Sequence, residues 1–346
     1  MTRRSAILRL LIGVAISAVF LALTLSRVNL AEVGAAIAAA SPAWLLVALG
    51  IVIVDVLLRA LRWQFLLHGV PGAGTKPPYR LAVGYLMIGF TANAILPARL
   101  GDIARAILAG DAFRIPRLAV FGTILIERLG DGLTMLVLAL VSSIVVASGI
   151  AELRDLATFA IGAGIAGVIA LLIMVAILSR PRVRATRFGG LVFGLLERVA
   201  AGAGAMTTVR GAATVVGLTW IVAFTAILVA WAVTNSVGLQ LTPVQLVLFM
   251  SGIALSLAIP AAPGALGTYE FVGTAIITSL GYTAEQGLAA ILLMRVITTF
   301  PPALAGLVSL FILQIRPGEL VQAAEDPSAA AEPTDADGPS LASRPG

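Results

Sequence analysis

The 346-residue chain is 60% hydrophobic and only 12% charged. About 25% of a soluble domain is charged, so this composition excludes a water-soluble fold. Cysteine is absent and His68 is the only histidine, which leaves almost no material for disulfides, metal sites or Ser-His-Asp catalysis, and we expect no metal and no cofactor. The net charge of +6 comes from basic residues in short loops between apolar runs, which indicates membrane topology and argues against nucleic-acid binding.

Apolar runs of roughly twenty residues recur along the chain, and this is the length that crosses a hydrocarbon core of about 30 Å as a helix. The expected full spans are 8–26, 43–58, 118–148, 156–178, 212–234 and 285–313. Arginines precede the first run as in a signal peptide, but the many later spans favour a retained first helix. Residues 1–316 therefore form the predicted membrane domain. Residues 317–346, where Pro, Ala, Asp and Glu dominate, are predicted to be a disordered cytoplasmic tail.

Two further apolar stretches are interrupted near their middle. The stretch 81–113 breaks at Pro97, and basic residues on both of its flanks place both ends in the cytoplasm. The stretch 244–281 breaks at Pro260 and opens to the outside if the carboxyl end is cytoplasmic. We expect an all-α polytopic membrane protein of about eight hydrophobic helical elements, with six full spans and two re-entrant hairpins. Both termini are expected in the cytoplasm, and the membrane is expected to be the cytoplasmic (inner) membrane.

The segment 180–210 carries the strongest basic cluster of the chain and is assigned to the cytoplasm. Apolar side chains recur at helical spacing from Phe188 to Val199. This pattern indicates either an amphipathic helix on the inner leaflet or ordinary core packing.

The two breaks share a pattern of apolar residues, then Pro-Ala, then Gly. The residues that form the breaks are Asn93, Pro97, Gly101, Pro260, Pro263, Gly264 and Gly267. Each break is followed by a carboxylate, Asp102 or Glu270, and one span later by an intramembrane arginine, Arg128 or Arg295. Their opposite orientation predicts an inverted repeat, in which interrupted helices mark a binding site near the midplane. A chance match of short Pro-Ala pieces is the alternative.

Glu127, Arg128 and Asp131 lie inside an otherwise apolar span. An ionisable side chain at a helix centre costs about 2.5–3.5 kcal/mol on insertion scales, so such residues pair with one another or line a substrate path. One interpretation is an interhelical ion pair in which Arg128 or Arg295 satisfies the two carboxylates. Contact with a substrate explains the same cluster equally well.

Arg99, Asp102 and Arg105 follow the first break, where the amino end of a new helix attracts anions. Because Arg99 can grip a phosphate with two hydrogen bonds, the head group of a phospholipid or of a polyprenyl phosphate is the expected ligand. The alternative assigns Asp102 to helix capping, which is preferred for this residue alone, and Arg105 to the membrane interface. At the second break, Glu270 is expected to hold a cation or to pair with Arg295.

Asp55, Arg59 and Arg62 recur at near-helical spacing at the inner end of the second span, beside Trp63. Snorkelling side chains and an aromatic belt explain most of this group, and only Asp55 is deep enough to indicate function. No catalytic residue is expected anywhere in the chain. The candidate substrate-binding residues are Arg99, Asp102, Arg105, Glu127, Arg128, Asp131, Glu270 and Arg295.

Four motifs carry a resemblance to a known family. They are Arg59-x-x-Arg62-Trp63, Asn93-x-x-Leu96-Pro97-Ala98-Arg99-x-Gly101-Asp102-x-x-Arg105, Glu127-Arg128-x-x-Asp131 and Pro263-Gly264-x-x-Gly267-x-x-Glu270. Over residues 5–315 the chain resembles the lysylphosphatidylglycerol synthase transmembrane region, a flippase-like domain family of bacterial and archaeal inner-membrane proteins. The resemblance implies an eight-helix flippase-like fold with re-entrant elements. In multidomain members this region is associated with moving aminoacylated phosphatidylglycerol to the outer leaflet. Their soluble transferase domain has no counterpart here, so aminoacyl transfer is not expected.

The leading hypothesis is therefore a translocase for an anionic lipid, either a phospholipid or a polyprenyl-phosphate-linked lipid. The sequence holds no ATP-binding P-loop, so transport is expected to run downhill or to be coupled to an ion through Glu127, Asp131 or Glu270. The alternative hypothesis is a non-transporting partner or regulator of a cell-envelope lipid or glycosyl transferase. An intramembrane transferase is the third hypothesis. The sequence leaves the oligomeric state open, a homodimer included.

Overall fold

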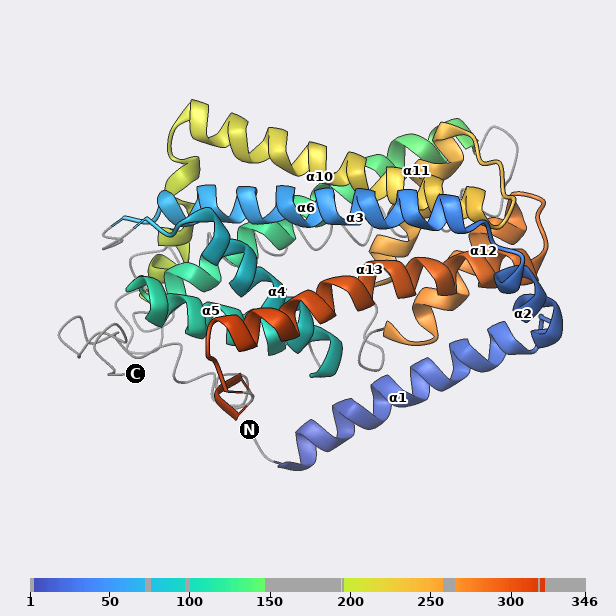
Figure 1. The fold of residues 1–346 in the computed structure, drawn as a ribbon, viewed down its shortest axis with the longest axis horizontal. Helices are drawn as coiled ribbons and strands as arrows, with labels where there is room; N and C mark the ends of the chain where they lie inside the picture. The colour runs from blue at the N-terminus through green and yellow to red at the C-terminus, as the bar shows by residue number, and fades with distance from the viewer. Residues whose placement is uncertain are drawn as a thin grey trace, which may run out of the picture.

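The structure is a computed structural model that describes residues 3–71, 76–96, 100–146, 194, 196–257, 265–316 and 318–320. Within these residues all regular structure is helical, as expected for an all-α membrane protein (Figure 1). The elements are α1 (Arg3–Leu25), α2 (Leu30–Ala38), α3 (Pro42–His68), α4 (Tyr79–Ile95), α5 (Leu100–Phe113), α6 (Arg117–Val146), the 3₁₀ helix η2 (Ala201–Met206), α10 (Val209–Ser236), α11 (Pro243–Ser256), α12 (Thr268–Ser279) and α13 (Ala284–Ile312).

Three of the described helices, α3, α10 and α13, are long and apolar enough to cross a membrane. The segment Gly13–Leu25 of α1 and helix α2 together form a fourth candidate, bent by 82° between the two helices. The protein is therefore a multi-pass membrane protein. Helix α6 coincides with the expected span 118–148, whereas the expected span 156–178 lies outside the described residues.

The long helices α3, α6, α10 and α13 run along the long axis of the molecule (Figure 1). Helices α4 and α5 lie toward one end of this bundle, and α11 and α12 lie toward the other. Close packing of α13 on α4 depends on Gly306, because a Cβ at this position would overlap the hydroxyl of Thr91. That hydroxyl also donates a hydrogen bond of 2.8 Å to the carbonyl oxygen of Ala303 on α13.

Helix α3 continues past the end expected for the second span and reaches His68. The expected boundary at residue 58 is wrong, because Arg59 and Arg62 lie inside the helix and both meet Asp131 on α6. Apolar residues such as Leu66 and Leu67 extend the buried face beyond them. Residues taken as part of a basic loop thereby become part of the protein interior.

Both expected breaks fall between helices. Helix α4 ends at Ile95 and α5 begins at Leu100, while α11 ends at Ser256 and α12 begins at Thr268. The break residues Asn93, Gly101 and Gly267 are described, whereas Pro97, Arg99, Pro260, Pro263, Gly264, the tail 321–346 and most of the basic segment 180–210 lie outside the described residues.

Glycine is required at one described position of the second break. Gly267 has a φ of +87°, which disfavours any residue with a Cβ. A Cβ there would also overlap the backbone oxygen of Ser17, so α1 lies directly against this turn.

Two large apolar clusters form most of the core of the described residues, with a small third one around Leu66. One large cluster gathers around Trp63, with side chains of α3 to α6 and of α13, and the other gathers around Phe249, with side chains of α2, α3 and α10 to α13. Val56 of α3 packs against both large clusters. Its neighbours Asp55 and Arg59 therefore lie where the two halves of the core meet.

Candidate functional site

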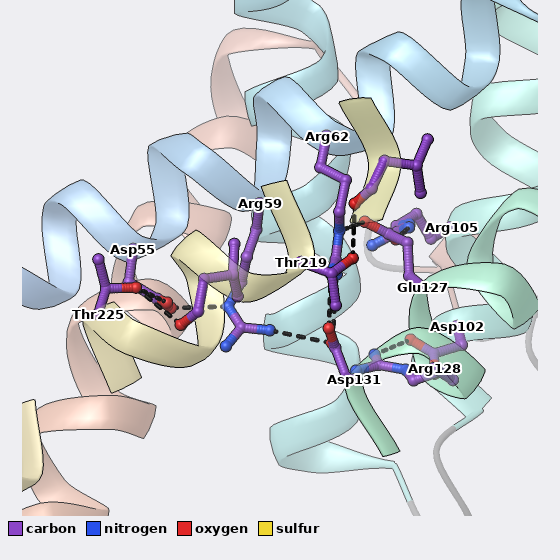
Figure 2. Close-up of polar contacts among 12 residues, drawn as sticks. Asp55, Arg59, Arg62, Asp102, Arg105, Glu127, Arg128, Asp131, Thr219 and Thr225 are labelled. Atoms are coloured by element: carbon purple, nitrogen blue, oxygen red, sulfur yellow. Dashed lines mark hydrogen bonds and ion pairs between the residues drawn. The ribbon is translucent and has the colours of Figure 1, made fainter. Parts of the chain in front are cut away.

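Eight charged side chains from α3, α5 and α6 form one group inside the bundle, which we call the ionic cluster (Figure 2). Its members are Asp55, Arg59, Arg62, Asp102, Arg105, Glu127, Arg128 and Asp131. Four arginines face four carboxylates, so the formal charge of the cluster is zero. This balance compensates for the high cost of placing single charges in a membrane interior.

Asp131 on α6 joins two arginines of α3. Its Oδ1 lies 2.5 Å from Nη1 of Arg62, and its Oδ2 lies 3.4 Å from Nη1 of Arg59. Arg59 also donates from Nε to Oδ2 of Asp55 at 2.6 Å. Helix α10 adds two hydroxyls, because Thr219 accepts a hydrogen bond from Arg62 and Thr225 donates one to Asp55. The cluster thereby ties α3, α6 and α10 together.

Glu127 on α6 holds the most deeply buried part of the cluster. Its Oε2 accepts a hydrogen bond of 2.5 Å from Arg105 on α5, and its Oε1 lies 3.4 Å from Nε of Arg62. The guanidinium of Arg105 stacks 4.0 Å above the ring centre of Trp63, whose indole N–H bonds to the hydroxyl of Thr123. Arg105 is only 1% exposed, so the alternative that assigned it to the membrane interface is wrong. These contacts lock α3, α5 and α6 together.

Arg128 on α6 grips Asp102 on α5 with two hydrogen bonds, of 3.0 Å from Nε and 2.8 Å from Nη2. The amide of Asn93 on α4 donates to the same carboxylate at 3.1 Å. Asp102 therefore links the helices on both sides of the first break, which helix capping alone does not require.

One of the two interpretations paired Glu127 and Asp131 across helices with Arg128 or Arg295; the interhelical pairing is present, but the arginines named for it were wrong. Their closest cationic partners come from α3 and α5, because the side chains of Arg62 and Arg105 project from those helices toward α6 (Figure 2). Arg128, the immediate neighbour of Glu127 in the chain, is directed instead toward α5.

A separate charged pair lies beside the second break. Nε of Arg295 on α13 is 2.6 Å from Oε1 of Glu270 on α12, which confirms the expected pairing of these residues. The other carboxylate oxygen of Glu270 accepts a hydrogen bond of 2.7 Å from the backbone N–H of Gly267. The guanidinium of Arg295 also lies 4.4 Å from the ring centre of Tyr269. Glu270 thus caps its own helix and fixes it to α13.

A cavity of about 490 Å³ lies between α3, α4, α6, α10, α11, α12 and α13. Four members of the ionic cluster form its charged wall, namely Asp55, Arg59, Arg128 and Asp131. The remaining lining is mostly apolar and includes Val52, Val56, Phe90, Met135, Val222, Val229, Met250, Ile253, Leu257 and Met294. The cavity is therefore amphipathic, with a charged wall from α3 and α6 and an apolar wall that comes largely from the second half of the chain.

The four arginines of the cluster differ in their access to this cavity. The side chains of Arg59 and Arg128 are 22% and 32% exposed. Those of Arg62 and Arg105 are each 2% exposed and do not line the cavity. In the part of the chain that is described, no three His, Cys, Asp or Glu side chains are arranged to hold a metal ion.

Residues 10–306 match the family described as the lysylphosphatidylglycerol synthase TM region. The chain belongs to this family. The matched range contains every member of the ionic cluster and all the residues that line the cavity. The ionic cluster and the cavity therefore lie within the part of the chain that matches the lysylphosphatidylglycerol synthase TM region family.

A curated relative is "Glycosyltransferase AglD" of Haloferax volcanii, which is 27% identical over 340 residues. The alignment covers 88% of this chain and 54% of the relative, so the chain spans about half the length of that protein.

Three residues of this cluster were not among the substrate-binding candidates in the sequence. Asp55, Arg59 and Arg62 follow one another at i, i+4 and i+7, which places them on one face of α3. That spacing was the available signal. It does not reveal whether the face meets lipid head groups or another helix, and the structure brings it against α6.

Proposed function

We propose that this protein binds an anionic lipid in the cavity beside the ionic cluster and carries the lipid across the membrane. The observation that supports this proposal most strongly is the amphipathic lining, in which two arginines and a large apolar wall share one space. Arginine suits a phosphate oxygen because its planar group donates paired hydrogen bonds. Methionine and branched aliphatic side chains suit a hydrocarbon chain.

The arrangement of the broken helices supports transport in addition to binding. Phe90 lies on α4 just before the first break, Leu257 follows α11 just before the second, and both line the cavity. We infer that the two broken units are re-entrant hairpins of an inverted repeat, with the cavity between them. In such transporters the substrate site lies at the interface of the repeats, and alternate opening on the two sides exposes it to each leaflet.

The topology that we propose has both termini in the cytoplasm and places the protein in the cytoplasmic membrane. In Figure 1 the amino-terminal end of α1 and the carboxyl-terminal end of α13 are directed toward the same end of the molecule. This agrees with the basic residues that flank the apolar runs.

The name of this relative bears on which lipid the protein carries. A glycosyltransferase that shares this membrane region supports a lipid that carries sugars, such as a polyprenyl phosphate, as a cargo alongside phospholipids. It also supports a second role, in which the protein serves a glycosyl transferase as a membrane partner without moving lipid. Because the chain has no expected catalytic residue, we do not propose that it forms the glycosidic bond itself.

Reconstitution tests the transport proposal. Purified protein in liposomes should accelerate the passage of a labelled phosphatidylglycerol or polyprenyl phosphate from the inner to the outer leaflet. The paired substitution Asp102→Asn with Arg128→Gln should slow this passage at least about tenfold, since a charge-assisted hydrogen bond contributes about 1.5–3 kcal/mol. The paired substitution Asp111→Asn with Arg117→Gln, in an exposed ion pair with an Nε–Oδ1 distance of 2.6 Å, is the control.

No acceleration for any lipid of the panel would contradict transport. A transferase that co-purifies with the protein, together with unchanged lipid exchange, would favour the partner role. Mass spectrometry of lipid retained by the gently purified protein identifies the cargo in either case.

A further inference from the structure

Two arginines that line the cavity, Arg59 and Arg128, each keep guanidinium N–H groups that have no acceptor among the described residues. Arg59 uses Nε for Asp55 and Nη1 for Asp131, and no described residue accepts a hydrogen bond from its Nη2. Arg128 uses Nε and Nη2 for Asp102, and no acceptor for its Nη1 occurs in the described ranges. Both side chains line the cavity and are partly exposed. Donors placed in this way are available to a ligand in the cavity.

Asp131 lies between the two guanidinium groups in Figure 2. Its oxygen is 3.4 Å from Nη1 of Arg59, whereas its other oxygen is 2.5 Å from Nη1 of Arg62. The carboxylate is therefore held firmly by the buried arginine and only loosely by the arginine that faces the cavity. Loss of the contact with Arg59 would leave Asp131 paired.

We propose that Arg59 on α3 and Arg128 on α6 together bind the phosphate of a lipid, which replaces Asp131 as the partner of Arg59. This assignment rests on the proposed function and adds Arg59 as its second phosphate-binding residue. Arg62 and Arg105 have a different role, since they are buried and pair with carboxylates on α6. Two arginines from different helices make binding sensitive to how α3 and α6 are placed.

The residues that line the cavity also indicate where the hydrocarbon chain of the bound lipid lies. Val52 and Val56 adjoin the arginine on α3, and Met135 lies one helical turn beyond Asp131 on α6. A phosphate bound at the arginines therefore has hydrocarbon next to it, and the lining has few other polar groups. Inorganic phosphate would gain nothing from these apolar side chains, whereas a phosphate attached to an acyl or prenyl chain would bury them.

The charges of the cavity wall predict that one substitution strengthens lipid binding, whereas loss of an arginine weakens it. The cavity wall holds two arginines and two carboxylates, so an arriving phosphate meets no net positive charge. Asp131→Asn removes the carboxylate that competes for Arg59 and leaves Arg62 with Glu127 and the hydroxyl of Thr219. This substitution should tighten the binding of a phosphate-bearing lipid, because the cluster gains one net positive charge.

Native mass spectrometry of the full chain in detergent measures binding directly. The probes are phosphatidylglycerol, a polyprenyl monophosphate and inorganic phosphate. The paired substitution Asp55→Asn with Arg59→Gln removes the second arginine without leaving an unpaired charge, and it should weaken the binding of at least one lipid probe about tenfold or more. Asp131→Asn should strengthen it. The paired substitution Asp111→Asn with Arg117→Gln should leave it unchanged.

The outcomes separate this inference from the proposed function. If the unsubstituted protein binds lipid and Asp55→Asn with Arg59→Gln binds it equally well, the role of Arg59 is refuted while lipid binding stands. Weaker binding in Asp131→Asn likewise refutes the exchange of partners. If the unsubstituted protein binds neither lipid, both proposals fail. Binding of inorganic phosphate as tight as that of the lipids contradicts the role of the apolar wall, and the lipid that binds more tightly identifies the source of the phosphate.

Discussion

Replacement of Glu127 by Gln tests whether the centre of the ionic cluster stabilises the protein. Glu127 is 6% exposed and faces Arg105 and Arg62, which are both buried. Arg62 keeps Asp131 when the charge of Glu127 is removed, whereas Arg105 loses its closest partner. Removal of one partner from a buried pair costs about 3–5 kcal/mol, and we expect Glu127→Gln to lower the free energy of unfolding by this amount.

A second substitution separates charge from packing. Arg105→Met in the same chain removes the orphaned charge and places a flexible apolar side chain against the ring of Trp63, where the guanidinium lies in the unsubstituted protein. Since buried ion pairs are often replaced by apolar groups without loss, the double variant should recover at least about 2 kcal/mol relative to Glu127→Gln. The assay is equilibrium unfolding in mild detergent micelles, with tryptophan fluorescence as the signal that reports unfolding.

The exposed pair of Asp111 and Arg117 supplies the control, because loss of a surface ion pair is worth only about 0–1 kcal/mol. If Glu127→Gln unfolds at the same free energy as the unsubstituted protein, the structural role of Glu127 is refuted. A double variant that is less stable than Glu127→Gln also refutes the reasoning.

Glycine positions give two further predictions. Gly306→Ala should lower the midpoint of thermal unfolding in detergent, because the added methyl group overlaps the hydroxyl of Thr91 and overpacking costs about 1–3 kcal/mol. Gly50→Ala has no atom within 4 Å of its new Cβ and should leave the midpoint equal or higher, so equal losses in both variants would contradict the packing argument. Gly267→Ala, at a φ of +87° and against the backbone of Ser17, should loosen α1 and speed amide hydrogen exchange at its carboxyl-terminal end. Unchanged exchange there would show that α1 does not depend on this turn.

Much of the helical architecture could be predicted, because the signal for each helix lies within its own stretch of sequence. Helix α10 covers the expected span 212–234 and α13 matches the expected span 285–313 to within one residue, since a run of apolar residues is itself the signal for a spanning helix. The pairing of Glu270 with Arg295 was also predictable, because the two residues lie on consecutive helices and each stands inside an apolar stretch.

The partners inside the ionic cluster could not be predicted in the same way. Arg62 and Asp131 are separated by 69 positions, and the sequence does not state which face of α3 meets α6. Read locally, an arginine at the end of an apolar run is a snorkelling residue, and this interpretation was wrong for Arg62 because α3 continues to His68. The cavity could not be predicted from the sequence either, because its lining comes from helices that only the folded bundle brings together.

The long separation between Arg62 and its carboxylates has a consequence for biogenesis. As the chain is made, α3 enters the membrane with two arginines and only Asp55 to neutralise one of them. The partners of Arg62 arrive with α6, after α4 and α5 have been synthesised. Until then, Arg62 gains from staying near the head groups, where its neighbour Trp63 also finds a favourable setting. We therefore expect the depth of α3 to be settled only when α6 joins it, with the same charges balancing the finished protein and ordering its assembly.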